Sequence, residues 1–421
     1  MQPYVGVESP FRPGFGIAPT VLAGRDDLLA FVQRRLQAST PFHRAIIGPR
    51  GEGKTVLLRQ IRDRVEEEHG WATVWNDCDS EQALSATVAR RLIACSREIP
   101  PLWERFSHAM ARRLNISVET LIKVSVTARP DEAVPADSLL VETMRELGKA
   151  VAEHGSKVVM FFDELQSLQG RQELVRLSQA LDTVNEGRLP IHTLHAGLYL
   201  PASPAERGGS FIERLDATVL SHLDLSATRL AVVEPLAREG IRVNEGAADR
   251  LVAASDGYPY FVQLFGDAAW EQWYRSGAAG PLTEEHVLAG LSEARATVDR
   301  LYRGRFDRLG PAQQQLLLAA ARARLADGVI EIGLVAKLLG KPVESLSNTR
   351  QALIERHQLI EPTGVRGQLR FVLPEFHSWL TQIGIDRAHE LEVRSTTKSG
   401  IAHAIEPPQE RIDRRPAPEI G

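Results

Sequence analysis

The residues from Gly48 to Thr55 have the types and spacing needed to hold a polyphosphate. They read Gly48-Pro49-Arg50-Gly51-Glu52-Gly53-Lys54-Thr55 and match the pattern G-x-x-x-x-G-K-[ST] in full. Glycines let backbone N–H groups approach phosphate oxygens closely, and a helix that begins at the end of the loop directs its positive end at the same anions. In this pattern the lysine, here Lys54, contacts the β- and γ-phosphates, and the hydroxyl, here that of Thr55, contacts Mg²⁺.

The residues on either side of this loop favour the same interpretation. Ala45–Ile47 is a short apolar run, and Thr55 to about Glu68 has apolar residues at helical spacing. A strand that enters the loop and a helix that leaves it are the context that a phosphate loop requires. The alternative is an ordinary glycine-rich turn between a strand and a helix. We include the whole loop and Val56 in the predicted nucleotide site.

Two carboxylates follow a second apolar run. Val158–Phe162 is fully apolar, as in a strand covered on both faces, and Asp163 and Glu164 come directly after it. In a parallel sheet both acids would lie at the carboxyl edge, where the phosphate loop also lies. We therefore predict that Asp163 holds the Mg²⁺ shell and that Glu164 orients and polarises the attacking water. The alternative is a solvated acidic turn.

Strands and helices alternate along the first half of the chain. Strand-like runs occur at 45–47, 72–75, 158–162, 191–195 and 217–220, and helical periodicity occurs at 28–36, 55–68, 81–97 and 171–185. This alternation predicts an α/β fold with a parallel sheet built from right-handed crossovers. Residues 98–137, which contain Pro100 and Pro101, are expected to form an insertion with a short helix and a polar stretch.

The second half of the chain has a different pattern. Amphipathic segments such as 245–255 and 260–273 predict a helical subdomain, whereas helices at 311–323, 332–339 and 343–357 followed by a β-hairpin at 360–373 predict a winged helix. The end of the chain is rich in proline and charge, which is typical of disorder. We divide the sequence into an extended arm (1–20), an α/β core (21–224), a helical lid subdomain (225–305), a winged-helix domain (306–383) and a disordered tail (384–421).

Composition restricts the class of protein. Hydrophobic residues make up 43% and charged residues 25% of the 421, as in ordinary soluble globular proteins. No apolar run is long enough to cross a membrane, and the N-terminus lacks the pattern of a secretory signal. The two cysteines, Cys78 and Cys95, are not spaced for zinc and are too few for a disulfide framework, so we expect a cytoplasmic protein.

These motifs resemble those of AAA+ P-loop ATPases. The more similar branch groups origin-recognition initiators and archaeal ATPases, which are related to signal-transduction NTPases. Gly24-Arg25 in Leu22–Asp26 is similar to the family's adenine-side box, and Gly257-Tyr258-Pro259 in Asp256–Leu264 resembles the lid signature G-x-P-x-x-x-Q. The resemblance implies that the nucleotide is ATP, that Gly24, Arg25, Tyr258 and Pro259 contact it, and that the C-terminal winged helix belongs to the same architecture.

Two further positions follow from the resemblance. Many AAA+ proteins place a polar residue at the end of the fourth strand to contact the γ-phosphate; His195 is our first choice for it and Thr193 the second, and a structural histidine is the alternative. Arg214 lies where an arginine finger would reach the nucleotide of a neighbouring subunit in a homo-oligomer, and a surface or helix-capping arginine is the alternative. The lid arginine of many initiators has no clear counterpart here.

The predicted winged helix contains candidate DNA contacts. They are Lys341 in a turn, Asn348 and Arg350 on the predicted recognition helix at 343–357, and Arg366 and Arg370 in the wing. Residues 306–383 hold nine Lys or Arg and seven Asp or Glu, and the whole chain has a net charge of −4, so the electrostatic footprint is weak. The alternative is a winged helix that docks a protein partner.

The residues therefore predict an ATPase whose nucleotide state controls how the lid and the winged helix are presented to a partner, with double-stranded DNA as the first choice. A second hypothesis is a slow nucleotide-dependent signalling switch that acts on a protein partner. A third is a small-molecule kinase that uses the same phosphate loop, against which the winged helix and the lid signature argue.

Overall fold

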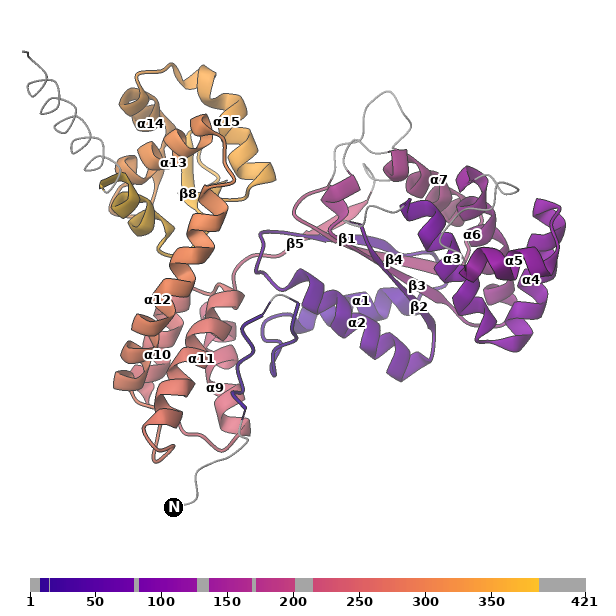
Figure 1. The fold of residues 1–421 in the computed structure, drawn as a ribbon, viewed down its shortest axis with the longest axis horizontal. Coiled ribbons are helices and arrows are strands. Elements are labelled where there is room, and N and C mark those ends of the chain that lie inside the picture. Colours follow the sequence, from indigo (N-terminus) through magenta and orange to yellow (C-terminus); the bar gives the residue numbers. More distant parts are fainter. Residues whose placement is uncertain are drawn as a thin grey trace, which may run out of the picture. The chain divides into compact units, whose positions relative to one another are not determined.

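The computed structural model describes residues 8–14, 16–78, 83–126, 136–168, 172–200 and 215–385. Figure 1 shows the helices and strands of the chain, coloured along the sequence. The chain divides into two compact units. The first consists of Met1–Leu301 with Gln351–Glu361 and Val372–Pro374, and the second of Tyr302–Arg350, Pro362–Phe371 and Glu375–Gly421. No described helix combines the length and the apolar character that a membrane crossing requires.

The first unit contains a five-stranded sheet with the order β2-β3-β4-β1-β5. Its strands are β1 (His43–Ile47), β2 (Ala72–Asp77), β3 (Val158–Asp163), β4 (Ile191–Gly197) and β5 (Asp216–Val219). All of its strand pairs are parallel. The predicted parallel α/β fold is therefore confirmed. Because β3 lies next to β4 and β4 next to β1, the acidic pair and the phosphate loop follow strands separated by one other strand in the sheet.

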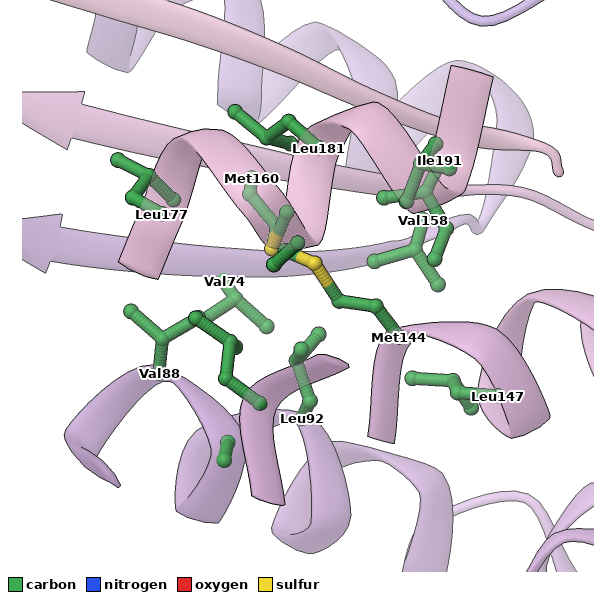
Figure 2. Close-up of a cluster of buried hydrophobic side chains, with 14 of the residues drawn as sticks. Val74, Val88, Leu92, Met144, Leu147, Val158, Met160, Leu177, Leu181 and Ile191 are labelled. Atoms are coloured by element: carbon green, nitrogen blue, oxygen red, sulfur yellow. The ribbon is translucent and has the colours of Figure 1, made fainter. Parts of the chain in front are cut away.

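Helices cover both faces of this sheet. α1 (Asp26–Gln37) and α2 (Lys54–His69) pack on one face, whose core includes Val159 and Phe161 of β3. The other face packs against five helices and includes the alternate β3 residues Val158, Met160 and Phe162. Those helices are α3 (Leu84–Arg97), α4 (Pro100–Leu114), α5 (Val118–Val126), α6 (Ala136–Glu153) and α7 (Gln172–Glu186). In this core, the side chain of Met144 on α6 reaches Met160 of β3 (Figure 2).

The segment 98–137, which was expected to be an insertion with a short helix and a polar stretch, is mostly helical over residues 98–126, and the expected polar stretch lies largely outside the described residues. Pro100 stands in the first turn of α4, where a proline is tolerated because the N–H that it lacks would have no partner in the helix. Phe106 and Met110 of α4 are fully buried and belong to the larger core. The expectation of a short helix was therefore wrong, because the two prolines start a long helix instead of interrupting one.

Four helices follow the sheet. They are α9 (Leu225–Arg238), α10 (Glu245–Ser255), α11 (Pro259–Arg275) and α12 (Glu284–Phe306). The N-terminal arm is attached to this part of the unit. Phe11 is 2% exposed, and its ring lies so close to Gly266 of α11 that a Cβ there would come within 2.5 Å of it. The backbone N–H of Arg12 donates to Oε1 of Gln263, also on α11 (2.9 Å).

The C-terminal segment is the part of the chain that was predicted to be a winged helix (306–383). It begins with α13 (Pro311–Ala323), β6 (Ile330–Glu331) and α14 (Ile332–Leu339). The two helices have the bounds that the sequence predicts. The predicted helix at 343–357 is irregular, because it consists of a 3-10 turn (η2, Val343–Leu346), one turn of α-helix (α15, Ser347–Gln351) and a π turn (η3, Ala352–Arg356). Strands β7 (Ile360–Pro362) and β8 (Gln368–Phe371) follow, and the sheet order is β6-β8-β7 with β6 and β8 antiparallel. The predicted tail lies outside the described residues from position 386 on.

Candidate functional site

The phosphate loop leaves β1 at Gly48 and enters α2 at Lys54. Gly48 lies against the end of β5, where a Cβ would come within 2.5 Å of the carbonyl oxygen of Leu220. Gly51 has a φ of 96°, and a Cβ there would lie 2.1 Å from the phenol oxygen of Tyr258. Glycine is required at both positions, because any side chain would displace backbone or a buried ring.

Lys54 is held inside the loop that precedes it. Its ammonium group donates to the carbonyl oxygens of Gly48 (2.8 Å) and Pro49 (2.7 Å). Burial lowers the pKa of Lys54 to about 8, and the charges of Glu164, Glu52 and Asp163 oppose this shift. The lysine therefore lies within electrostatic reach of the acidic pair and of the loop glutamate.

The two predicted Mg²⁺ ligands lie next to each other. Oγ1 of Thr55 donates to Oδ2 of Asp163 at 2.7 Å, although 108 positions separate them in the chain. Burial raises the pKa of Asp163, and the hydrogen bonds from Thr55 and from the backbone N–H of Glu164 lower it in part. Hydroxyl and carboxylate oxygens are the hard ligands that Mg²⁺ prefers, so the pair fits a Mg²⁺ ion that also contacts phosphate.

Glu164 stands in an uncommon backbone conformation. Its φ is 56°, in the left-handed region, and such residues persist only where surrounding contacts hold them. Its N–H donates to Oδ1 of Asp163 (2.9 Å), and its carbonyl oxygen accepts from Oγ of Ser167 (2.6 Å). Its side chain accepts a short hydrogen bond from Nε2 of Gln166. We did not predict Gln166; its position two residues after Glu164 was the only signal in the sequence.

Glu52 is buried at the centre of the phosphate loop, with 1% of its surface exposed. Its carboxylate lies 3.8 Å from Nη2 of Arg25 and 3.2 Å from Nε2 of His222. Arg25 also donates to the carbonyl oxygen of Ser221 (2.8 Å), and burial lowers its pKa while the charge of Glu52 raises it. The predicted adenine-side residue Arg25 is thus tied to the loop, together with His222, which we did not predict.

Tyr258 brings the lid signature onto the phosphate loop. Its side chain is fully buried, and its hydroxyl donates to the carbonyl oxygen of Arg50 at 2.5 Å. Pro259 is the first residue of α11, where its fixed φ favours the start of a helix. Gly24 has a φ of 67° and packs against Ala227 of α9. Val56 is buried in α2, so its side chain belongs to the core and only its backbone can face a ligand.

His195 lies in a buried polar network within the sheet. Its Nε2 is hydrogen-bonded to Oγ1 of Thr193 (2.7 Å), which is also 2.8 Å from Nδ1 of His43. Its ring stacks on Phe162, with 5.0 Å between centroids. Nδ1 of His192 accepts from the backbone N–H of Phe42 (3.0 Å). This geometry matches the alternative of a structural histidine, and contact with a γ-phosphate stays a prediction. Arg214 lies outside the described residues.

The five predicted DNA contacts all belong to the second unit. Lys341 follows α14, Asn348 and Arg350 lie on α15, Arg366 lies in the turn between β7 and β8, and Arg370 lies on β8. All are exposed except Arg350, which is half-buried. The spacing of the predicted recognition helix directs Leu346, Leu353 and Ile354 towards the core; Leu346 and Leu353 are buried, and Ile354 is half-buried.

Comparisons with known proteins give two family matches. Residues 21–194 match the family model of the AAA ATPase domain, and residues 299–380 match a domain of unknown function (DUF8462). No curated protein matches the sequence. These matches connect the phosphate loop and the acidic pair to one family and leave the C-terminal segment without a function.

Three solved structures show how far the likeness of fold extends. A Walker-type ATPase of Pyrococcus abyssi has a TM-score of 0.61 and 17% identity, and the match covers 88% of this chain and 98% of that one. The Orc1 protein of Aeropyrum pernix in complex with DNA has a TM-score of 0.40, 15% identity and coverages of 86% and 94%. The RuvB Holliday junction branch migration motor of Thermotoga maritima has a TM-score of 0.42, 14% identity and coverages of 87% and 98%. At this identity the first likeness concerns the fold alone, and the other two are too distant to add to it.

Proposed function

We propose that this chain, whose residues 21–194 match the AAA ATPase domain and have a P-loop α/β fold, binds ATP with Mg²⁺ and hydrolyses it to ADP and phosphate. The observation that carries the proposal is the hydrogen bond between Thr55 and Asp163. It joins the phosphate loop to the acidic pair, so that groups able to bind phosphate, a metal ion and water lie at one edge of the sheet.

Each of these residues has a distinct role in the proposed reaction. The loop N–H groups and the Lys54 ammonium group bind the β- and γ-phosphates, and Thr55 and Asp163 would hold Mg²⁺, which neutralises charge on the phosphate oxygens when bound. Glu164 accepts a hydrogen bond from a water molecule and orients it for in-line attack on the γ-phosphorus. Tyr258 and Arg25 hold the loop from the lid and the adenine side.

Two substitutions test this assignment. Lys54→Ala should abolish ATP binding, whereas Glu164→Gln should keep ATP affinity and lower the turnover number by about 10²–10⁴-fold, the usual contribution of a general base. Binding is measured by calorimetry and turnover by phosphate release. Glu67→Gln, which changes an exposed glutamate of α2 in the same way, is the control and should behave as the wild type. Undiminished turnover in Glu164→Gln would refute the role of Glu164.

We further propose that the C-terminal segment is a winged helix that binds duplex DNA under the control of the nucleotide. The order of its elements, helix, strand, two helices and a hairpin, and its antiparallel β6–β8 pair support this interpretation. Lys341, Arg366 and Arg370 are exposed and carry the positive charge that phosphate contacts require. Stimulation of the ATPase rate by duplex DNA at low salt tests the coupling.

A second candidate function is a slow switch whose C-terminal segment docks a protein. The observation that favours it is exposed apolar surface on that segment. Leu334 and Leu338, one turn apart on α14, are 39% and 56% exposed, and Val365 is 57% exposed. A near-zero ATPase rate that DNA leaves unchanged, together with tight ATP binding, would support this candidate over the first. The role of Arg214 as an arginine finger in a homo-oligomer stays a prediction for both candidate functions.

A further inference from the structure

The side-chain amide of Gln166 lies between Glu164 and the end of β4. Gln166 belongs to the 3-10 turn η1 (Leu165–Leu168), whose end residues Leu165 and Leu168 are fully buried. Its Nε2 donates a short hydrogen bond to Oε2 of Glu164. Its Oε1 accepts from the backbone N–H of Leu198, the residue after β4, at 2.8 Å. A single side chain therefore connects the proposed general base to the neighbouring strand.

The orientation of this amide is fixed by chemistry. A backbone N–H can only donate, so the atom that faces Leu198 must be the carbonyl oxygen of Gln166. The amide NH₂ group then faces Glu164, whose ionised carboxylate can only accept. Gly197 contributes as well, because a Cβ at that position would lie 3.0 Å from Oε1. The amide reaches the backbone at the end of β4 because a glycine precedes Leu198.

We propose that Gln166 is a positioning residue for ATP hydrolysis, which fixes the rotation of the Glu164 carboxylate and makes it depend on the end of β4. The inference rests on the proposed function. A carboxylate held through one oxygen has one other oxygen with which to bind the attacking water, in a direction set by the hydrogen bond to Gln166. The left-handed backbone of Glu164 and its bonds to Asp163 and Ser167 fix the start of the side chain, and Gln166 fixes its end.

The first test removes both hydrogen bonds with little change of shape. Gln166→Leu should lower the turnover number by about 10–100-fold, the effect expected when a catalytic group is misplaced, and leave the dissociation constant for ATP within about twofold. Gln179→Leu, at an exposed position of α7, is the matched control and should change neither value. In a Glu164→Gln background, Gln166→Leu should cause no further loss, because the group that it positions is already removed.

The second test separates the two halves of the contact. Gln166→Glu keeps an oxygen for the N–H of Leu198 but replaces the donor that faces Glu164 with an ionised acceptor. Its turnover number at pH 8 should fall at least as far as in Gln166→Leu. As the pH is lowered towards 5.5, the introduced acid takes up a proton and becomes a donor again. The ratio of variant to wild-type activity should therefore rise at low pH, which a purely structural defect would not produce.

The outcomes also separate this inference from the proposed function. If wild-type protein hydrolyses ATP, Glu164→Gln abolishes turnover and Gln166→Leu does not lower it, the role of Gln166 is overturned and the ATPase assignment stands. An additive loss in the double variant, or a ratio for Gln166→Glu that stays flat with pH, also overturns it. If Glu164→Gln keeps full turnover, Glu164 does not orient the attacking water and the role of Gln166 fails with it, whereas absence of ATP hydrolysis by the wild-type protein would overturn the proposed function itself.

Discussion

The proposed nucleotide site and the C-terminal segment differ in where they place their polar residues. At the proposed nucleotide site, groups far apart in the sequence are hydrogen-bonded to one another in partly buried positions, as Thr55 is to Asp163 and Tyr258 is to Arg50. On the C-terminal segment, Lys341, Arg366 and Arg370 are exposed to solvent. Side chains that are hydrogen-bonded to one another are held in one geometry, whereas exposed cations can bind many anions, with an affinity that depends on ionic strength. The site therefore shows what it can do more sharply than the segment shows what it binds.

The largest effect that this difference predicts is acid sensitivity of the sheet. Burial lowers the pKa of His43 to about 4 and of His192 and His195 to about 3. In the unfolded chain these groups titrate near 6.5, so below that pH the unfolded state binds more protons and stability falls. Above pH 6.5 these three histidines are neutral in both states and do not make the free energy of unfolding depend on pH. We expect the free energy of unfolding to fall between pH 6.5 and about 4, by about 1.4 kcal/mol per pH unit for each histidine.

Urea denaturation at a series of pH values measures this slope. His43→Gln should reduce the slope whatever it does to the stability at pH 7, because one titrating group is removed. His154→Gln, at an exposed position, should leave the slope unchanged. A free energy of unfolding that is constant from pH 6.5 to 4.5 would show that the sheet tolerates charged histidines, and the contrast between the two regions would be weaker than we describe.

The second effect concerns the N-terminal residues that pack on α11. Phe11→Ala removes a buried ring from the surface of α11 and should lower the stability of the first unit by about 3 kcal/mol, the lower end of the range for such changes. Ile17→Ala changes a residue of the same arm that is 52% exposed and should cost less than about 0.5 kcal/mol. Thermal unfolding of both variants gives the comparison. Equal losses would mean that the arm is not anchored through Phe11.

The third effect is the pH dependence of ATP binding. The pKa of Lys54 is lowered to about 8, so above that pH the free protein increasingly loses the charge that the phosphates need. Affinity for MgATP should be constant below about pH 7, begin to fall between pH 7 and 8, and fall by roughly tenfold per pH unit well above pH 8. Calorimetry in buffers of different ionisation enthalpy should show proton uptake on binding. Lys149→Ala, at an exposed position, should keep the same profile, and a flat profile to pH 9.5 would contradict the proposed contact.

The smallest effect belongs to the C-terminal segment. Arg350→Ala combined with Arg366→Ala should weaken duplex binding and reduce the dependence of log affinity on log salt by roughly one for each phosphate that the variant no longer neutralises. Arg112→Ala, at an exposed position of α4, should not change the slope. An unchanged slope in the double variant would remove the DNA interpretation and favour the protein-docking alternative.

Local patterns predicted the fold well where both ends of an element carry signals. The helix at 311–323 begins at Pro311 after the N-cap Gly310, and that at 332–339 ends before Gly340, whose φ of 62° ends a helix without strain. Periodicity could not show that 343–357 mixes three kinds of helical turn, since each kind extends over only four or five residues and one turn is too short to define a repeat. Strand β6 was missed because its two residues carry no pattern.

Only part of the candidate functional site could be predicted, because only part of it consists of continuous sequence motifs. The loop and the acidic pair are continuous motifs, so their residues could be assigned without knowledge of the fold. His222 lies beside Glu52, and Gln166 bonds to the backbone N–H of Leu198, only in the folded chain, so these two contacts could not be predicted from the residue types alone. Glu52 was included as part of the loop, but its burial against Arg25 and His222 could not be predicted, because acidic residues are rarely buried without partners.

The two bonds of Lys54 to its own loop have a consequence for selectivity. The carbonyl oxygens of Gly48 and Pro49 compete with any ligand for the same ammonium group, and their effective concentration is fixed by the chain. A small anion that offers little beyond one contact to Lys54 gains almost nothing from the exchange. A polyphosphate that also occupies the loop N–H groups gains several bonds for the two it displaces, so this internal competition should discriminate against free phosphate.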